Sequence, residues 1–196
     1  MACNPISNNV NYDCKSETAL AGLKTIYAIA VEDVDTVTFG VGALEHTVTA
    51  ITTLAAAKFI SIKSRFETRD FTAEMNRENY NTKTEKTINI FVPGQEKETL
   101  GALNELACAS KLLIIAELSN VDSATGNPKA IVAGWDKNLG ADGGLLFAGN
   151  TSIETEVGGL NGTNGVFTGV GTEIVRRIEG TITVEDGAAG TPVVFA

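Results

Sequence analysis

The chain has 196 residues, of which 43% are hydrophobic, so it can bury the core of one ordinary domain and is not expected to be disordered. Its formal charge at pH 7 is −9, from 15 Lys and Arg against 24 Asp and Glu. This balance argues against a protein that grips nucleic-acid phosphates, because such binding draws on a basic surface. The sequence has no run of about 18 apolar residues, which argues against a membrane-spanning helix.

Both ends of the chain are predicted to be extended arms. Residues 1–22 are polar and irregular, and residues 187–196 are also arm-like. The first residues lack the basic start and apolar stretch of a secretion signal, so we expect the protein to stay in the cytosol that makes it. No internal repeat or linker divides the sequence, and we expect a single domain over residues 1–196.

The stretch between the arms is predicted to be mostly strands. Val, Ile and Thr dominate between the 20 glycines, which favours sheet over helix. Alternation is clearest in the middle of the chain, where Ile88, Ile90 and Val92 oppose Thr87 and Asn89. A period of two places one face on a core and leaves the other for solvent or a partner. The predicted strands cover residues 23–31, 34–39, 45–54, 58–66, 70–77, 84–92, 112–118, 129–135, 150–157, 165–170 and 174–184.

One helix interrupts the strands. Residues 97–109 place Leu100, Leu103 and Leu106 on one side at a helical spacing. The apolar run 112–118 that follows is predicted to be a central strand buried on both faces. The expected fold is mainly β (α+β), a β-sandwich or β-barrel with one flanking α-helix.

No residue is predicted to carry out catalysis or to bind a cofactor or a metal ion. His46 is the sole histidine, and no Gly-x-Ser-x-Gly motif presents a serine nucleophile to it. The stretch from Asp136 to Phe147 starts like a calcium loop, but Ala141 and Phe147 stand where such a loop needs Gly and Glu. We therefore interpret it as a turn, and we expect a protein that is not an enzyme.

The three cysteines, Cys3, Cys14 and Cys108, have no metal-binding spacing. In a reducing cytosol they are expected to be free thiols. Cys108 lies in the apolar helical stretch and is predicted to be a core residue. A bond between Cys3 and Cys14 would require the first arm to fold back, and the sequence leaves that open.

Several segments together resemble the tail tube proteins, or major tail proteins, of bacteriophages that infect Bacteroidetes. The resemblance begins with Tyr12-Asp13-Cys14 and the stretch 21–27, although the family usually has a second glycine where Ala21 stands. It continues through 87–91, the helix and the apolar strand. It extends over nearly all of the sequence, with later matches at 133–136, 143–147, 161–166 and 192–195.

The resemblance implies a tail-tube-like β-sandwich with a flanking helix. Six copies would close into a homo-hexameric ring, and rings would stack into an acidic channel through which DNA passes without specific binding. The protein would belong to the virion tail after assembly in the bacterial cytoplasm, with tape-measure, tail-terminator and baseplate proteins as partners. Contacts between subunits are expected from residues of the two arms: Pro5, Ile6, Tyr12, Val193, Val194 and Phe195.

Three other functions remain open at this stage. The same fold could form the tube of a contractile injection or secretion machine, and only neighbouring genes would discriminate it from a phage tail. A capsid or tail decoration protein would bind a preformed lattice and remain monomeric or trimeric alone. A small hydrolase would depend on His46.

Overall fold

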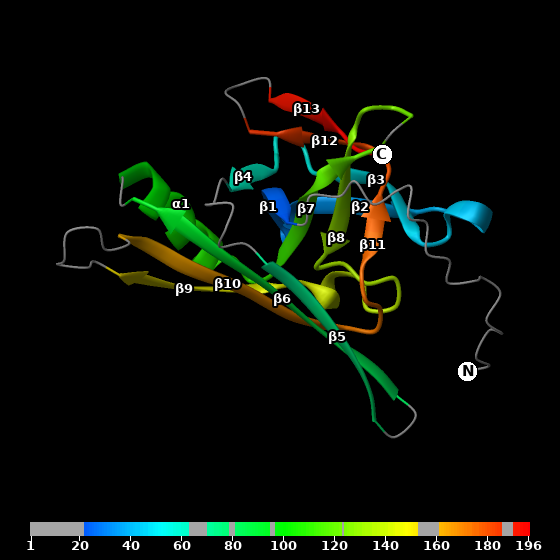
Figure 1. Ribbon diagram of the computed structural model, residues 1–196, viewed down its shortest axis with the longest axis horizontal. Coiled ribbons are helices and arrows are strands. Elements are labelled where there is room, and N and C mark those ends of the chain that lie inside the picture. Colours follow the sequence, from blue (N-terminus) through cyan, green and yellow to red (C-terminus); the bar gives the residue numbers. More distant parts are fainter. Residues whose placement is uncertain are drawn as a thin grey trace.

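The computed structural model describes residues 22–62, 70–78, 81–94, 97–122, 124–152, 161–185 and 190–196. Residues 1–21 of the first predicted arm, with Pro5, Ile6, Tyr12, Cys3 and Cys14, lie outside these ranges. Figure 1 shows a body made mainly of strands, with the helix α1 (Lys97–Cys108) at one side. The expected fold class is confirmed, because the described residues are mainly β, in several sheets, with one α-helix.

The largest sheet has seven strands in the order β2-β3-β11-β8-β7-β1-β4. Most neighbours are antiparallel, and β11 runs parallel to β3. The strands are β1 (Leu23–Ala30), β2 (Val34–Phe39), β3 (Thr47–Thr53), β4 (Ile60–Ile62), β7 (Leu112–Val121), β8 (Pro128–Ala133) and β11 (Arg176–Ile178). Short 3-10 helices lie at Val31–Asp33 (η1), Gly42–Leu44 (η2) and Ala141–Gly143 (η4).

Two smaller sheets accompany it. The first has four antiparallel strands in the order β5-β6-β10-β9. The second is the hairpin of β12 and β13. Their strands are β5 (Asp70–Glu78), β6 (Asn81–Pro93), β9 (Leu146–Ser152), β10 (Gly162–Gly171), β12 (Thr181–Val184) and β13 (Thr191–Val194).

The seven-stranded sheet has a hydrophobic core on each face. On one face Ile114 packs with Leu103 and Leu106 of α1 and with Ile88 and Phe167 of the four-stranded sheet. On the other face the neighbouring positions of β7 pack with β3, with β12 and with Phe195. Residues 112–117 are all buried, so the prediction of a central strand buried on both faces is confirmed.

Two sequence predictions are wrong. Cys108 is exposed, because α1 buries the side that carries Leu103 and Leu106, and a residue two positions after Leu106 points away from it. Residues 191–196 of the second predicted arm do not form an arm, because they pack on their own chain. Thr191–Val194 pairs with β12, and Phe195 is a core residue with an exposed fraction of 3%.

Two strand predictions also needed changes in their bounds. The strand expected over 174–184 is two strands, β11 and β12, because the chain leaves the sheet at Gly180 and starts a hairpin. The strand expected from residue 150 begins at Leu146 instead. Its predicted end at 157 falls outside the described residues.

Candidate assembly surface

The four-stranded sheet has one face on the core and one face away from it. The cross-strand register places Ile88 of β6 opposite Phe167 of β10, and Phe167 opposite Phe147 of β9. These three side chains belong to the first core. Because side chains alternate along a strand, the intervening positions share the opposite face. We call this opposite face the outer face.

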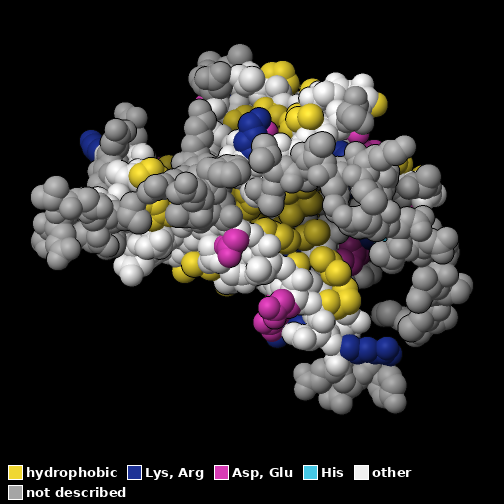
Figure 2. Space-filling model, viewed as in Figure 1, with side chains coloured by type: hydrophobic (Ala, Val, Ile, Leu, Met, Phe, Trp, Pro, Cys, Tyr) yellow, Lys and Arg dark blue, Asp and Glu magenta, His cyan; other side chains and the backbone are white. Residues whose placement is uncertain are grey.

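The outer face is mostly polar and carries more negative than positive charge. Among the described residues, its carboxylates belong to Asp70, Glu74 and Glu85. Its positive charge belongs to Lys83, whose Nζ lies 2.6 Å from Oε1 of Glu85. Apolar side chains are concentrated on β9 and β10. The outer-face positions are Asp70, Thr72, Glu74, Asn76, Lys83, Glu85, Thr87, Asn89, Phe91, Leu146, Ala148, Asn150, Asn164, Val166, Thr168 and Val170. In Figure 2, charged side chains lie around the β5–β6 hairpin in the lower part of the view, and hydrophobic ones gather at the centre.

Within the described residues, each edge strand of this sheet, β5 and β9, has one side whose backbone groups pair with no other strand. Within the described residues, β5 pairs only with β6, and β9 pairs only with β10. An unpaired strand edge offers a row of N–H and C=O groups to another strand. Figure 1 also shows that the β5–β6 hairpin extends beyond the rest of the molecule. The sheet can therefore be continued on either side by another chain.

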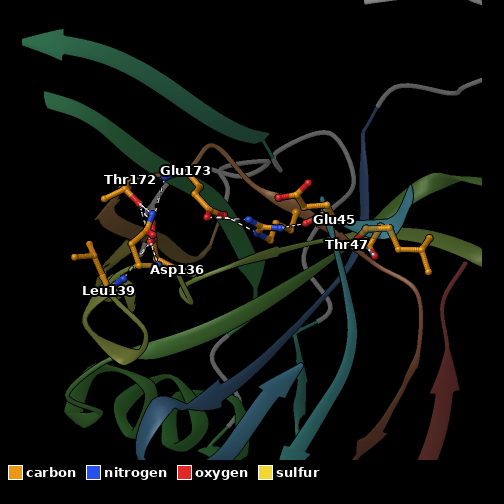
Figure 3. A network of polar contacts seen from close by, with 9 residues as sticks. Glu45, Thr47, Asp136, Leu139, Thr172 and Glu173 are labelled. Atoms are coloured by element: carbon orange, nitrogen blue, oxygen red, sulfur yellow. Dashed lines mark hydrogen bonds and ion pairs between the residues drawn. The ribbon is translucent and has the colours of Figure 1, made fainter. Parts of the chain in front are cut away.

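Asp136 fastens the end of this sheet to the seven-stranded sheet. Its side chain is fully buried in the loop after β8. Oδ1 accepts hydrogen bonds from the backbone N–H groups of Asn138 (2.8 Å) and Leu139 (3.2 Å) and from Thr172 Oγ1 (2.8 Å). Oδ2 accepts from the backbone N–H groups of Thr172 (2.6 Å) and Glu173 (3.2 Å). Since Thr172 directly follows β10, the carboxylate holds two distant parts of the chain together (Figure 3).

The pKa of Asp136 follows from these contacts. Burial, the largest single influence, would raise the pKa, but the hydrogen bonds from Thr172, Asn138 and Leu139 together hold it below its usual value. The loop that starts like a calcium loop is thus a turn closed by N–H donors around an aspartate, as the sequence indicated. Among the described residues, no group of three or more His, Cys, Asp or Glu could hold a metal ion.

Arg176 extends the network toward the β2–β3 connection. Its Nε and Nη2 donate to Glu173 at 2.5 and 2.8 Å, and its Nη1 donates to the backbone carbonyl of Glu45. The guanidinium carbon lies 5.0 Å from the centre of the Phe39 ring. Thr47 closes the same connection by donating to the Leu44 carbonyl at 2.7 Å (Figure 3). The position of the four-stranded sheet is therefore fixed by paired and buried polar groups.

Among the described residues, sequence reasoning missed three buried side chains that carry a charge. Asp136, Lys86 and Glu117 have exposed fractions of 0%, 2% and 3%. Burial lowers the pKa of Lys86, and the charges of Asp136 and Glu173 oppose that effect. Lys86 could have been found by extending the alternation backward, because it lies two residues before Ile88 on the core face.

Of the candidate contact residues of the sequence, Val193, Val194 and Phe195 lie within the described ranges. His46 is exposed in the turn before β3. Separately, no described helix is long and apolar enough to cross a membrane. Val193 and Val194 lie in β13, whereas Phe195 contacts Tyr27 edge to face at 5.9 Å between ring centres and so is used within its own chain. A contact of Val193 or Val194 with another subunit stays a prediction.

Comparison of the chain with protein families, with curated proteins and with solved structures gives no match.

Proposed function

We propose that this protein is a structural, non-enzymatic subunit of a bacteriophage tail tube. Six copies would form a ring, and stacked rings would enclose an acidic channel for passage of the genome. The protein would act in the virion tail after assembly in the host cytoplasm. Its partners would be other copies of itself and the tape-measure, tail-terminator and baseplate proteins.

The observation that carries the proposal is the four-stranded sheet. It has a polar, net negative outer face, and its edge strands β5 and β9 each leave one side unpaired within the described residues. If β5 of one copy pairs with β9 of the next, each edge is completed and the outer faces form one continuous wall. Such a wall would repel the DNA phosphates, so DNA would slide without sticking. The sequence resemblance to tail tube proteins supports the same arrangement.

Crosslinking tests the proposed pairing. In a background with Cys3, Cys14 and Cys108 replaced by Ser, Thr72→Cys would mark β5 and Ala148→Cys would mark β9. Both positions are exposed on the outer face. With a short bismaleimide, we expect a ladder of products that ends at six copies, and negative-stain images should show rings or tubes of uniform diameter.

A matched pair provides the control. Asp35→Cys on β2 and Ser61→Cys on β4 mark exposed positions on the two edges of the seven-stranded sheet and should give no ladder. Thr72→Cys alone should give at most a dimer. A protein that remains monomeric or trimeric at high concentration, without a ladder, would contradict the tube and favour a decoration protein.

A further inference from the structure

The β2–β3 connection presents two apolar side chains to solvent. Val41 and Leu44 have exposed fractions of 85% and 42%, and no large hydrophobic side chain among the described residues is more exposed than Val41. We call Val41 and Leu44 the apolar knob. Single apolar side chains scattered over a surface are ordinary, but these two lie on one turn, around η2. Together they form a small apolar surface that water solvates poorly.

Hydrogen bonds hold the turn that carries the apolar knob. The backbone N–H of Leu44 donates to the Val41 carbonyl at 3.3 Å, and Thr47 Oγ1 donates to the Leu44 carbonyl at 2.7 Å. Arg176 donates to the carbonyl of Glu45. A contact made by a preorganised turn loses less conformational entropy than one made by a loop that must first be ordered. The knob is therefore ready to bind without rearrangement.

An apolar groove lies at the opposite edge of the seven-stranded sheet. It has a volume of about 400 Å³ and runs between β4 and α1. Its apolar walls come from these two elements and from β6, and consist of Ile60, Ile62, Val92, Ala102, Leu103 and Leu106. Ser61 and Thr99 also line it. Aliphatic side chains that enter this groove would leave water, which is favourable.

The apolar knob cannot reach the groove of its own chain. The knob follows β2 and the groove borders β4, and these strands are the two ends of the order β2-β3-β11-β8-β7-β1-β4. Six spacings of about 4.8 Å put these two edges roughly 29 Å apart. Figure 1 shows the same separation, with the β2–β3 connection at the right of the view and α1 at the left. A second copy is needed to bring a knob to this groove.

We propose that Val41 and Leu44 of one copy insert into the groove between β4 and α1 of the next copy. This contact rests on the proposed function, because it adds a second interface to the proposed ring. A contact between two different surfaces of the same chain runs head to tail, and it closes into a ring when the rotation allows. Because α1 packs beside β9, a copy whose β5 pairs with β9 also lies next to the groove.

Crosslinking tests the contact. In the same cysteine-free background, Val41→Cys marks the knob and Ala102→Cys marks an exposed position on the groove wall. With a short bismaleimide, we expect a ladder that ends at six copies, whereas a mixture of the two single variants should stop at a dimer. Leu54→Cys with Ala102→Cys is the control without a ladder, because Leu54 is exposed at the other end of β3. Asp35 lies roughly 20 Å from Val41 along β2, so Asp35→Cys with Ser61→Cys stays a negative control.

The outcomes separate this contact from the proposed pairing of β5 with β9. A ladder from Thr72→Cys with Ala148→Cys, but none from Val41→Cys with Ala102→Cys, overturns the knob contact alone. The converse result supports the knob contact and contradicts the strand pairing. A double variant of Val41 and Ala102 whose products stop at two copies overturns the head-to-tail contact. If neither pair gives a ladder, the tube and the knob contact both fail.

A charge introduced into the knob provides a test without crosslinks. Val41→Asp should raise the protein concentration needed for assembly by about tenfold or more, because a carboxylate replaces the buried aliphatic side chain. Its Tm as a single chain should not fall, since Val41 is exposed there. Adding Ala102→Lys should restore assembly by pairing the two charges, and Leu54→Asp should assemble as the wild type does. An equal effect of Val41→Asp and Leu54→Asp, or no rescue by Ala102→Lys, overturns the proposal.

Discussion

The Tyr27 hydroxyl donates a hydrogen bond of 2.9 Å to Oε2 of Glu117. Tyr27 belongs to the core on the face of the seven-stranded sheet that also holds Phe195. The other carboxylate oxygen, Oε1, lies 2.7 Å from the Nζ of Lys24, whose side chain is largely exposed. The ring of Tyr27 also contacts the ring of Phe195 edge to face. Burial, followed by the hydrogen bond and the charge of Glu117, raises the pKa of Tyr27.

This relationship predicts a loss of stability at alkaline pH. Because the folded-state pKa of Tyr27 is raised, the unfolded chain releases the phenolic proton first. The free energy of unfolding should therefore fall as the pH rises above about 10. Urea unfolding between pH 8 and pH 11 measures it. Tyr27→Phe should lower the free energy of unfolding by about 1–2 kcal/mol at pH 7, but this free energy should fall less steeply with rising pH than in the wild type. Equal slopes of the free energy against pH for the two proteins would contradict the prediction.

Asp136→Asn should destabilise the protein at neutral pH. The amide NH₂ group cannot accept hydrogen bonds, so in either orientation it faces N–H donors that the carboxylate satisfied. We expect a loss of about 2–3 kcal/mol in the free energy of unfolding. Asp122→Asn is a control at a loop carboxylate that also accepts backbone hydrogen bonds, from Ala124 and Thr125, but is less buried, and it should cost less.

The same carboxylate should contribute to acid sensitivity. A depressed folded-state pKa gives stability that is present above the unfolded value, about 4, and is lost as the pH falls through the folded value. The wild-type protein should therefore lose stability below about pH 4 more steeply than Asp136→Asn does. Chemical unfolding at pH 2 to 6 compares the two, and parallel curves would show that Asp136 is not responsible.

Much of the strand arrangement could be predicted from alternation. The core face through Ile88, Ile90 and Val92 is buried as expected, and the run 112–117 is buried on both faces. These patterns depend only on neighbours along one strand. The order of the strands does not depend on such neighbours alone, since the pairing of β11 with β3 joins residues more than a hundred positions apart.

The polar groups of the interior illustrate the same limit. Local sequence places Lys86 and Thr84 on the apolar face of β6, but the close approach of Lys86 and Asp136 to the backbone of Gly171 exists only after β10 pairs with β6. Likewise, the sequence around Asp136 indicates a turn, whereas its bonds to Thr172 and Glu173 come from a segment 36 and 37 residues away. Side-chain type along the chain cannot show such contacts.

Gly134→Ala should be strongly destabilising. Gly134 has φ of +97°, and a Cβ atom there would lie 2.3 Å from the Leu112 carbonyl oxygen. Both the left-handed backbone and the contact with main-chain atoms of β7 exclude a side chain. We expect a loss of about 3 kcal/mol or more, measured by urea unfolding. Gly101→Ala in α1, where a Cβ atom meets nothing within 4 Å, should instead be neutral or stabilise by up to about 1 kcal/mol.

Phe195→Ala tests the role of the C-terminal segment as part of the core. The ring is buried against Tyr27, and the backbone N–H of Phe195 donates to the Gly180 carbonyl at 2.8 Å. Removing a buried ring should cost about 3–5 kcal/mol. Val194→Ala, at a position with an exposed fraction of 46%, should cost less than about 1 kcal/mol. If Phe195→Ala is fully stable as a monomer but fails to assemble, the residue acts as a contact between subunits instead.

Selective labelling in assembled tubes tests which face lines the channel. Thr168→Cys, in the cysteine-free background, places a thiol on the outer face at an exposed position of β10. In tubes it should react with a small maleimide but not with a maleimide carrying a bulky polymer, which cannot enter a narrow channel. Asp35→Cys, exposed on β2 of the seven-stranded sheet, should react with both reagents. In dissociated subunits both thiols should react with both reagents. Equal labelling of the two positions by the bulky reagent in intact tubes would show that the outer face of the four-stranded sheet does not line the lumen, even if tubes form.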